Sequence, residues 1–433
     1  MENLDYARLQ MAFTLGFHII FACIGMVMPF FMVVSHGKWL KTRNPVYLKL
    51  TKAWQKGVAI FFVTGAVSGT ALSFELGMLW PEFMKHAGPI IGMPFSLEGA
   101  AFFVEAIALG FYLYGWNKLP EKFHWFTGVI IGLSGVASGI LVVSANGWMN
   151  APSGFDYING EFTNIDPVQA FLNAAWFTQA LHMTLAAFVA TSFAVAGVHA
   201  YQIFRNKNPE LHKKAFKIAI VFGGVAAILQ PLSGDLSAKD IAERQPVKLA
   251  AMEAHYETQK NVPLFIGGIV DEENRKVTNK IEIPGALSFL AFGDFDAEVK
   301  GLNDFPDDEL PPVAVVHYAL QIMVGLGTIL MLSCSFYFVS TRRKKWQESK
   351  KFWLYFTFLA PLGFIALEAG WVVTEVGRQP WIIYGIMKTK EAVTPMPGME
   401  FSFYMYVLVY FVLGITVTWL MRRQIKVLNA SKD

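Results

Sequence analysis

Four residues that can bind iron lie in, or at the end of, long apolar runs of the sequence. They are His18, His182, Met323 and Glu375. Ionisable groups in such runs are costly and mark functional sites by default, although any one of these residues alone is more simply explained by packing. Together, neutral imidazoles and a thioether suit haem iron, because a His and a Met form a six-coordinate electron-transfer centre. A carboxylate ligand would leave an open site able to bind oxygen.

Two carboxylates, Glu98 and Glu105, lie seven residues apart in another apolar run and therefore share one face of a helix. A buried carboxyl group without a counter-charge is driven toward its neutral form, so such a pair can pass protons along the helix. Both acids could instead hydrogen-bond to neighbouring helices or form the ion site of a transporter. The spacing favours a shared aqueous path.

The elements that must position these residues are predicted membrane-spanning helices. Hydrophobic residues make up 54% of the chain and charged residues only 16%, below the roughly 25% of soluble proteins. A spanning helix needs about 20 mostly apolar residues. We therefore predict an all-α integral membrane protein with about nine transmembrane helices, arranged as two four-helix bundles plus one peripheral helix. The predicted spans lie near 11–34, 58–80, 95–116, 126–145, 180–203, 216–234, 313–340, 353–375 and 402–421.

The distribution of basic residues predicts the orientation of these helices. The loops after the first, third, fifth and seventh spans, together with the C-terminal tail, hold most of the 36 Lys and Arg residues. Because cytoplasmic loops carry the excess of Lys and Arg, we expect the N-terminus outside and the C-terminus in the cytoplasm. His18, Glu98, His182 and Met323 then follow the outer starts of their helices, and Glu375 precedes the outer end of its own. These side chains are expected in one layer near the outer face.

One connection is too polar to span the membrane and too long to be a simple loop. We divide the chain into helices one to six at 1–234, an outside segment at 235–312, and helices seven to nine at 313–433. The net charge of +3 implies no nucleic-acid partner. Only two cysteines occur, which excludes a disulfide framework, an iron–sulfur site and covalent haem attachment through C-x-x-C-H.

Several motifs, in order along the whole chain, resemble subunit I of the cytochrome bd-type quinol oxidases, and the short outside segment resembles that of the short-loop members. The motifs are Arg8-Leu9-Gln10 followed by His18, Ser144-Ala145-Asn146-Gly147-Trp148-Met149, Lys248-Leu249-Ala250-Ala251-Met252-Glu253, Glu368-Ala369-Gly370-Trp371, and Gly377-Arg378-Gln379-Pro380-Trp381.

The resemblance implies a role for each candidate residue. His182 and Met323 match the axial ligands of a low-spin haem b. His18 and Glu375 match ligands of two high-spin haems, and which residue serves which haem stays open. The other matches are Glu98 and Glu105 for proton delivery, Arg378 for a haem propionate or the nearby carboxylate, Trp371 and Trp381 for packing on the porphyrins, Asn146 for cofactor binding, and Lys248 and Glu253 for quinol binding.

The resemblance also implies cofactors, partners and an activity. The expected cofactors are a low-spin haem b, a high-spin haem b, and a haem d or a third haem b. The expected partners are a second large membrane subunit (subunit II), a small single-helix subunit, membrane quinol and O2. The expected activity is oxidation of quinol at the outer face of a bacterial cell membrane with reduction of O2 to water, which generates proton-motive force.

Two other interpretations remain open at this point. A membrane cytochrome b that only relays electrons would need paired His ligands at matched depths, whereas this sequence offers His, Met and Glu. A secondary transporter using Glu98 and Glu105 predicts discontinuous helices and no cofactor, and it leaves the Gly377–Trp381 motif unexplained. A visible absorption spectrum of the purified protein, oxidised and reduced, separates all three.

Overall fold

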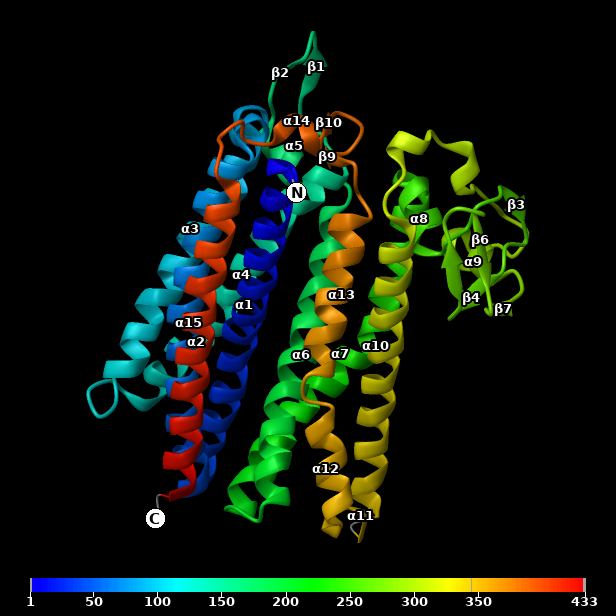
Figure 1. Cartoon of the computed structure of the whole chain (residues 1–433). Coiled ribbons are helices and arrows are strands. Elements are labelled where there is room, and N and C mark those ends of the chain that lie inside the picture. Colours follow the sequence, from blue (N-terminus) through cyan, green and yellow to red (C-terminus); the bar gives the residue numbers. More distant parts are fainter. Residues whose placement is uncertain (1, 344, 431–433) are drawn as a thin grey trace.

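The computed structural model describes residues 2–343 and 345–430. Within these residues nine helical spans are long and apolar enough to cross a membrane (Figure 1), as predicted. One of them is formed by two consecutive helices, α12 and α13. The spans are α1 (Asn3–Thr42), α2 (Pro45–Leu79), α3 (Pro81–Tyr114), α4 (Glu121–Asn150), α6 (Trp176–Phe204), α7 (Pro209–Arg244), α10 (Val313–Arg342), α12 (Lys350–Phe358) with α13 (Leu362–Val376), and α15 (Met399–Ala430).

The spans pack in two neighbouring groups. Helices α1 to α4 contact one another, and so do α6, α7, α10 and the α12–α13 span. Contacts of α1 and α4 with α6 join the groups, while α15 lies along α1 and α2 (Figure 1). The boundary between the groups therefore runs beside α1, α4, α6 and α13.

Proline residues set the starts of several helices. Pro45, Pro81 and Pro209 each stand at the first turn of a span, where the missing N–H is not needed and the fixed φ suits a helix. The Asn44 side chain also accepts a hydrogen bond from the Val46 N–H at 2.9 Å, which caps α2. The connections that precede these three prolines are short, so the spans that they join run antiparallel.

The eighth span is interrupted where the sequence predicted one continuous helix over 353–375. Helix α12 ends at Phe358 and α13 begins at Leu362. Pro361 lies in the break and accounts for it, because proline lacks the N–H that a helix interior needs and its ring clashes with the preceding turn. Opposite the break, Ala360 contacts Gly197 of α6 so closely that a Cβ at position 197 would clash.

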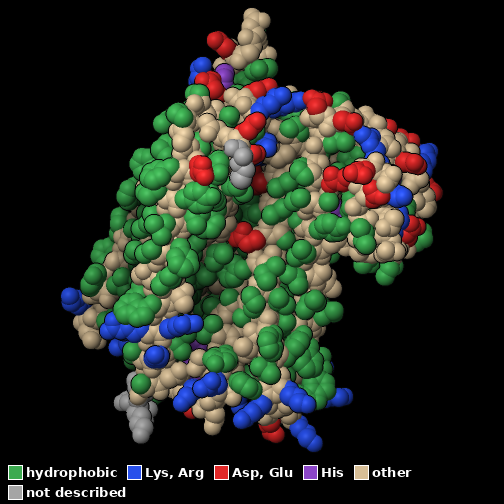
Figure 2. All heavy atoms as spheres, viewed as in Figure 1, with side chains coloured by type: hydrophobic (Ala, Val, Ile, Leu, Met, Phe, Trp, Pro, Cys, Tyr) green, Lys and Arg blue, Asp and Glu red, His purple; other side chains and the backbone are tan. Residues whose placement is uncertain are grey.

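The two ends of the molecule differ in character. One end, called here the loop end, carries most of the short elements (Figure 1). At the other, called the basic end, Lys and Arg side chains gather (Figure 2). The short elements are α5 (Pro167–Phe171), α8 (Pro246–Met252), α9 (Ala286–Phe292), α11 (Lys345–Glu348), α14 (Thr389–Ala392), the 3-10 turns Leu302–Asp304 and Asp307–Glu309, β1 (Asp156–Ile158), β2 (Glu161–Thr163), β3 (Gln259–Lys260), β4 (Leu264–Ile266), β5 (Ile269–Asp271), β6 (Lys276–Thr278), β7 (Ile281–Ile283), β8 (Glu298–Val299), β9 (Trp381–Ile383) and β10 (Met387–Lys388).

The strands form five antiparallel pairs. These are β1 with β2, β3 with β8, β4 with β7, β5 with β6, and β9 with β10. Three of the pairs fold the segment between α8 and α10 into a small unit at the loop end. The first ten residues of the predicted outside segment are helical, because α7 continues to Arg244 beyond the end of the apolar run near 234.

Candidate functional site

His18 lies on α1 and faces α2. Its Nδ1 atom is 2.9 Å from Ser68 Oγ, and a Cβ added at Gly69 would lie 3.0 Å from His18 Cε1. Ser68 therefore fixes one ring nitrogen, as a supporting hydrogen bond does for a metal-binding histidine. Gly69 leaves space along the ring that any other residue would fill.

His182 lies on α6 in an equivalent arrangement with α7. Its Nδ1 atom is 3.0 Å from Ser233 Oγ. The Gln230 amide nitrogen lies 3.1 Å from His182 Nε2, and Gln230 Oε1 is buried without a hydrogen bond. A metal at Nε2 would replace the Gln230 contact.

Met323 lies on α10 and faces α13. A Cβ added at Gly370 would lie 3.0 Å from the Met323 sulfur. The sulfur therefore lies directly against the backbone of residue 370, in space that a side chain at this position would fill. Gly370 belongs to the Glu368–Trp371 motif, and its contact with Met323 is a physical reason for a glycine at this position of the motif.

Glu375, near the end of α13, belongs to a polar network with α4. The Arg378 Nη2 atom donates to Glu375 Oε2 at 2.7 Å, and the Asn146 amide donates to Glu375 Oε1. Arg378 is only 3% exposed, and its Nε and Nη1 atoms have no hydrogen-bond partner. A buried guanidinium with two free donors fits a second anion, such as a carboxylate.

Lys248 joins this network from α8. Its Nζ atom donates to Asn150 Oδ1 at 3.2 Å and to the Thr374 carbonyl at 3.0 Å. Burial, followed by the nearby positive charge of Arg378, lowers the pKa of Lys248 to about 7. Lys248, Arg378 and Trp381 also line one small cavity. Predicted residues from four parts of the sequence, namely Asn146, Lys248, Glu375 with Arg378, and Trp381, thus come together.

Glu253 follows the last residue of α8. Its side chain has no hydrogen bond to any residue that the structure describes, and burial raises the pKa of this carboxyl group to about 7. The structure does not link it to Lys248, whose ammonium group points to α4 and α13. The adjacent Met252 carbonyl accepts a hydrogen bond from His317 Nδ1 at 2.9 Å, which fastens this turn to α10.

Glu98 and Glu105 both lie on α3 and face α4. Glu98 hydrogen-bonds Ser138. A Cβ added at Gly135 would lie 3.5 Å from Glu105 Oε2. Glu105 is buried and Glu98 half-buried, so the predicted common face is the inward one.

The two predicted tryptophans occupy different positions. Trp371 is half-buried on α13 and packs against the apolar core. Trp381 opens β9, and the Lys388 ammonium lies 5.4 Å from the centre of its ring.

Two further acids of the apolar runs, Glu75 and Glu368, also belong to this region, although the sequence assigns them no separate role. Glu75 is fully buried, and its Oε1 accepts hydrogen bonds from the Gln10 amide at 3.0 Å and the Thr14 hydroxyl at 3.1 Å. Glu368 Oε2 would lie 3.2 Å from a Cβ at Gly16, and its Oε1 is buried without a partner. The available signal was an acid within an apolar run, together with the seven-residue spacing of Glu368 from Glu375.

These features fit haem groups. Each imidazole has its Nδ1 held by a serine from the next helix, glycines clear space beside His18 and Met323, and Arg378 has unused donors for an anion. Among the described residues no three His, Cys, Asp or Glu side chains converge as a metal cluster.

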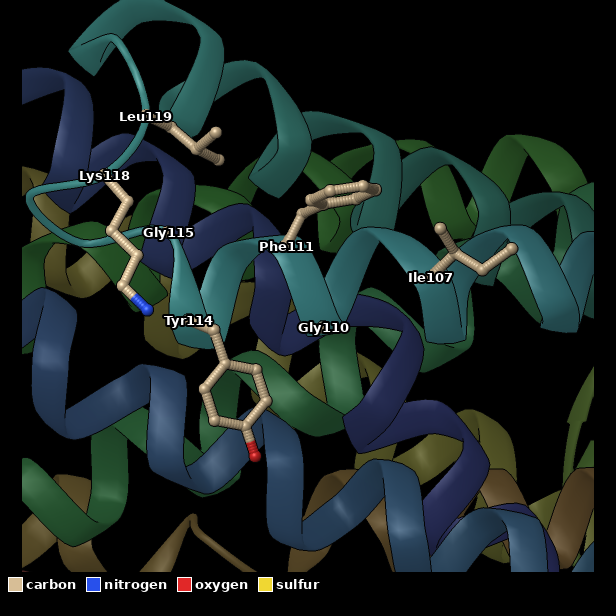
Figure 3. Close-up of a pocket in the computed structure, with 7 residues that line it drawn as sticks. All are labelled: Ile107, Gly110, Phe111, Tyr114, Gly115, Lys118 and Leu119. Carbon is tan, nitrogen blue, oxygen red and sulfur yellow. The ribbon is translucent and has the colours of Figure 1, made fainter.

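One surface cavity lies away from these residues. It has a volume of about 520 Å³ and lies along α3 and the following turn (Figure 3). Its lining is Ile107, Gly110, Phe111, Tyr114, Gly115, Lys118 and Leu119. It contains none of the predicted site residues.

The chain is similar to proteins of known type along nearly all of its length. The model of the family "Cytochrome bd terminal oxidase subunit I" matches residues 6–428. A putative cytochrome bd menaquinol oxidase subunit I from Bacillus subtilis (strain 168) is 37% identical, with 97% of this chain and 96% of that protein covered. The cytochrome bd ubiquinol oxidase subunit 1 of the same organism is 31% identical over 98% of this chain and 94% of that protein.

A solved structure shows the same fold. The bd oxidase from Geobacillus thermodenitrificans includes a chain that superposes with a TM-score of 0.93 at 36% identity, with 98% of both chains covered. Sequence motifs, nine spans and this superposition agree. The chain therefore belongs to the cytochrome bd terminal oxidase subunit I family, and it is the catalytic subunit of a quinol oxidase in a bacterial membrane.

Proposed function

We propose that this chain holds a low-spin haem b between His182 and Met323, and two high-spin haems through His18 and Glu375. The observation that carries the proposal is that both imidazoles have Nδ1 fixed by a serine of the neighbouring helix, which leaves Nε2 as the nitrogen for iron. Haem iron supplies one-electron transfer and, where a ligand position is open, oxygen binding. One high-spin haem is of b type, and the other is haem d or a third haem b.

Residues around Glu375 position the high-spin haems in this proposal. Arg378 neutralises Glu375 and offers its free Nε and Nη1 donors to a propionate. Asn146 holds the other carboxylate oxygen. Trp371 and Trp381 pack against the porphyrins, which suits their half-buried positions on α13 and β9.

The quinol site is proposed at the loop end, with Lys248 and Glu253. Oxidation of a quinol releases two protons and two electrons, so the site needs a base that can accept a proton near neutral pH. Glu253 meets this need because burial raises the pKa of its carboxyl group to about 7. The Lys248 ammonium is a donor for a quinol oxygen.

Protons for oxygen reduction are proposed to reach the haems along α3 through Glu105 and then Glu98. If the basic end faces the cytoplasm, these protons come from the side opposite to quinol oxidation. Charge is then separated across the membrane without a dedicated pump. The oxidase is proposed to include subunit II and a small single-helix subunit.

Replacement of Met323 by Leu tests the haem assignment. Loss of the thioether should convert the low-spin haem b to a high-spin form that binds carbon monoxide, as measured by visible spectra of the reduced oxidase with and without the gas. Met331→Leu, on the same helix and packed against the core, is the matched control. An unchanged low-spin spectrum in Met323→Leu would refute the assignment.

A further inference from the structure

A buried group of aromatic and histidine side chains closes the basic end of the first four helices. We propose that His36, Tyr112 and His124 form the entrance through which protons reach Glu105. This inference rests on the proposed role of Glu105 in proton delivery. It adds the route from the surface to that acid, entirely within this chain.

The three residues touch one another and exclude bulk water. The Tyr112 hydroxyl lies 2.8 Å from His36 Nδ1. His124 Nε2 donates to the Tyr112 backbone carbonyl at 2.8 Å, and the His36 and His124 ring centres are 5.2 Å apart. Tyr112 is 0% exposed, His36 1% and His124 3%, so α1, α3 and α4 each supply one polar group to an enclosed cluster.

Tyr112 continues the face of α3 that carries the two acids. Tyr112, Glu105 and Glu98 follow one another at intervals of seven residues, which is about 10 Å along a helix axis. Tyr114, two residues further on, is instead 76% exposed. The inward face of α3 thus bears a protonatable group at regular intervals from the basic end toward the haem ligands.

Helix α4 packs closely against this face through glycines. A Cβ at Gly128 would lie 2.8 Å from the Tyr112 ring, and one at Gly135 would lie 3.5 Å from Glu105 Oε2. The two glycines are also seven residues apart, so small residues on α4 stand opposite large polar ones on α3. Ser134, beside Gly135, adds a buried hydroxyl group. Seven residues correspond to about 10 Å along the helix axis, so the proposed transfer from Tyr112 to Glu105 requires a few bridging waters, since each hydrogen bond spans about 2.8 Å.

The chemistry of the step follows from the imidazole. His36 can accept a proton on one ring nitrogen and pass another from Nδ1 to the Tyr112 oxygen. The phenol then releases its own proton toward Glu105, so no charge remains on Tyr112.

Charged residues lie around this cluster, on its solvent side. Arg43 and Glu121 form an exposed ion pair at 2.6 Å between α1 and α4, and the Lys52 ammonium of α2 lies 5.2 Å from the Trp116 ring centre. The Trp116 indole N–H in turn donates to Gln55 Oε1 at 2.6 Å. Polar and charged groups of α1, α2 and α4 therefore lead from solvent to the enclosed histidines.

The test uses Tyr112→Phe in the complete oxidase reconstituted in liposomes. Removing one hydroxyl group should slow proton uptake after reduced enzyme meets oxygen by about tenfold or more, as followed with a pH dye, while the haem spectra stay unchanged. Tyr114→Phe, on the outward face of the same helix, is the matched control and should behave as the parent protein. His36→Gln is a second variant, which removes the imidazole that hydrogen-bonds to the Tyr112 hydroxyl.

Glu105→Gln is measured in parallel to separate the two claims. Slow proton uptake in Glu105→Gln but normal uptake in both Tyr112→Phe and His36→Gln would overturn the entrance and leave the role of Glu105 intact. Normal uptake in Glu105→Gln would overturn that role itself. Slow uptake in all three variants, with intact haem spectra, is the result expected from the proposal.

Discussion

Arg378 is a buried charged side chain whose hydrogen-bond donors are only partly used. A buried charge is stable only when ions or hydrogen bonds compensate it, yet one of its nitrogens serves Glu375 while Nε and Nη1 have no acceptor. The protein alone therefore leaves this guanidinium incompletely satisfied. The proposed haem propionate would supply both the charge and the acceptors for these two donors.

The pH dependence of quinol oxidation provides a test at Glu253. Because burial raises the pKa of this carboxyl group to about 7, it is mostly protonated below pH 7 and becomes a base above it. The rate of quinol oxidation should therefore rise as pH increases through about 7. Glu253→Gln should lower turnover severalfold and remove this rising limb, measured as steady-state quinol oxidation from pH 5.5 to 8.5.

The exposed Glu257, four residues further along the chain, offers a matched control for this measurement. Glu257→Gln should keep the parent pH profile. An unaltered rising limb in Glu253→Gln would assign the base to another group.

Individual site residues differed in how well the sequence predicted them. His18 and His182 can be singled out because ionisable side chains stand out in apolar runs, whereas Met323 is proposed mainly from the resemblance to the family. Their supports Ser68, Ser233 and Gly370 were not singled out as supports, because the sequence does not fix the rotation of one helix against the next. That rotation depends on packing between helices rather than on residues near in sequence.

Helix α7 shows at the level of elements that a helix can extend beyond the apolar run that predicts it. The sequence from 235 onward is polar, yet the helix continues to Arg244. Lys239 pairs with Asp235 at 2.6 Å, and Arg244 pairs with Asp240, each four residues apart. Such pairs support a solvated helix, so hydropathy located the end of the apolar run rather than the end of the helix.

The contact between α10 and α13 can be tested with a single methyl group. Gly370→Ala places a Cβ 3.0 Å from the Met323 sulfur, closer than ordinary van der Waals contact. The sulfur must move away, so the low-spin haem should lose part of its six-coordinate spectrum and its midpoint potential should shift. Redox titration followed by visible absorption measures both effects.

Gly110→Ala is the comparison for this variant, because a Cβ there meets no atom within 4 Å. It should leave the spectrum and the potential unchanged. A parent-like potential in Gly370→Ala would show that the Met323 side chain does not depend on this contact.

The orientation of the whole molecule can be tested by cysteine labelling. The native Cys23 and Cys334 are both 1% exposed, so they should give little background with a maleimide that cannot cross membranes. If the loop end is outside, Asn279→Cys should be labelled in intact spheroplasts. Lys207→Cys, at the basic end between α6 and α7, should be labelled only after lysis.

The reverse pattern of labelling would place the quinol segment in the cytoplasm. The basic end would then face outward, so protons from quinol would be released in the cytoplasm while protons for oxygen reduction were taken up from outside. The charge separated by this route would have the opposite sign and would not generate proton-motive force.

The depth of the acids on α3 has a consequence for regulation by voltage. Glu98 and Tyr112 are fourteen positions apart, which is about 21 Å of a hydrocarbon core of about 30 Å. Moving one elementary charge across the whole membrane against 100 mV costs about 2.3 kcal/mol, so this stretch alone accounts for roughly 1.5 kcal/mol. Oxygen consumption should therefore slow as the membrane becomes energised and recover when an ionophore discharges it. The proposed path along α3 would thus couple the rate of respiration to the membrane potential.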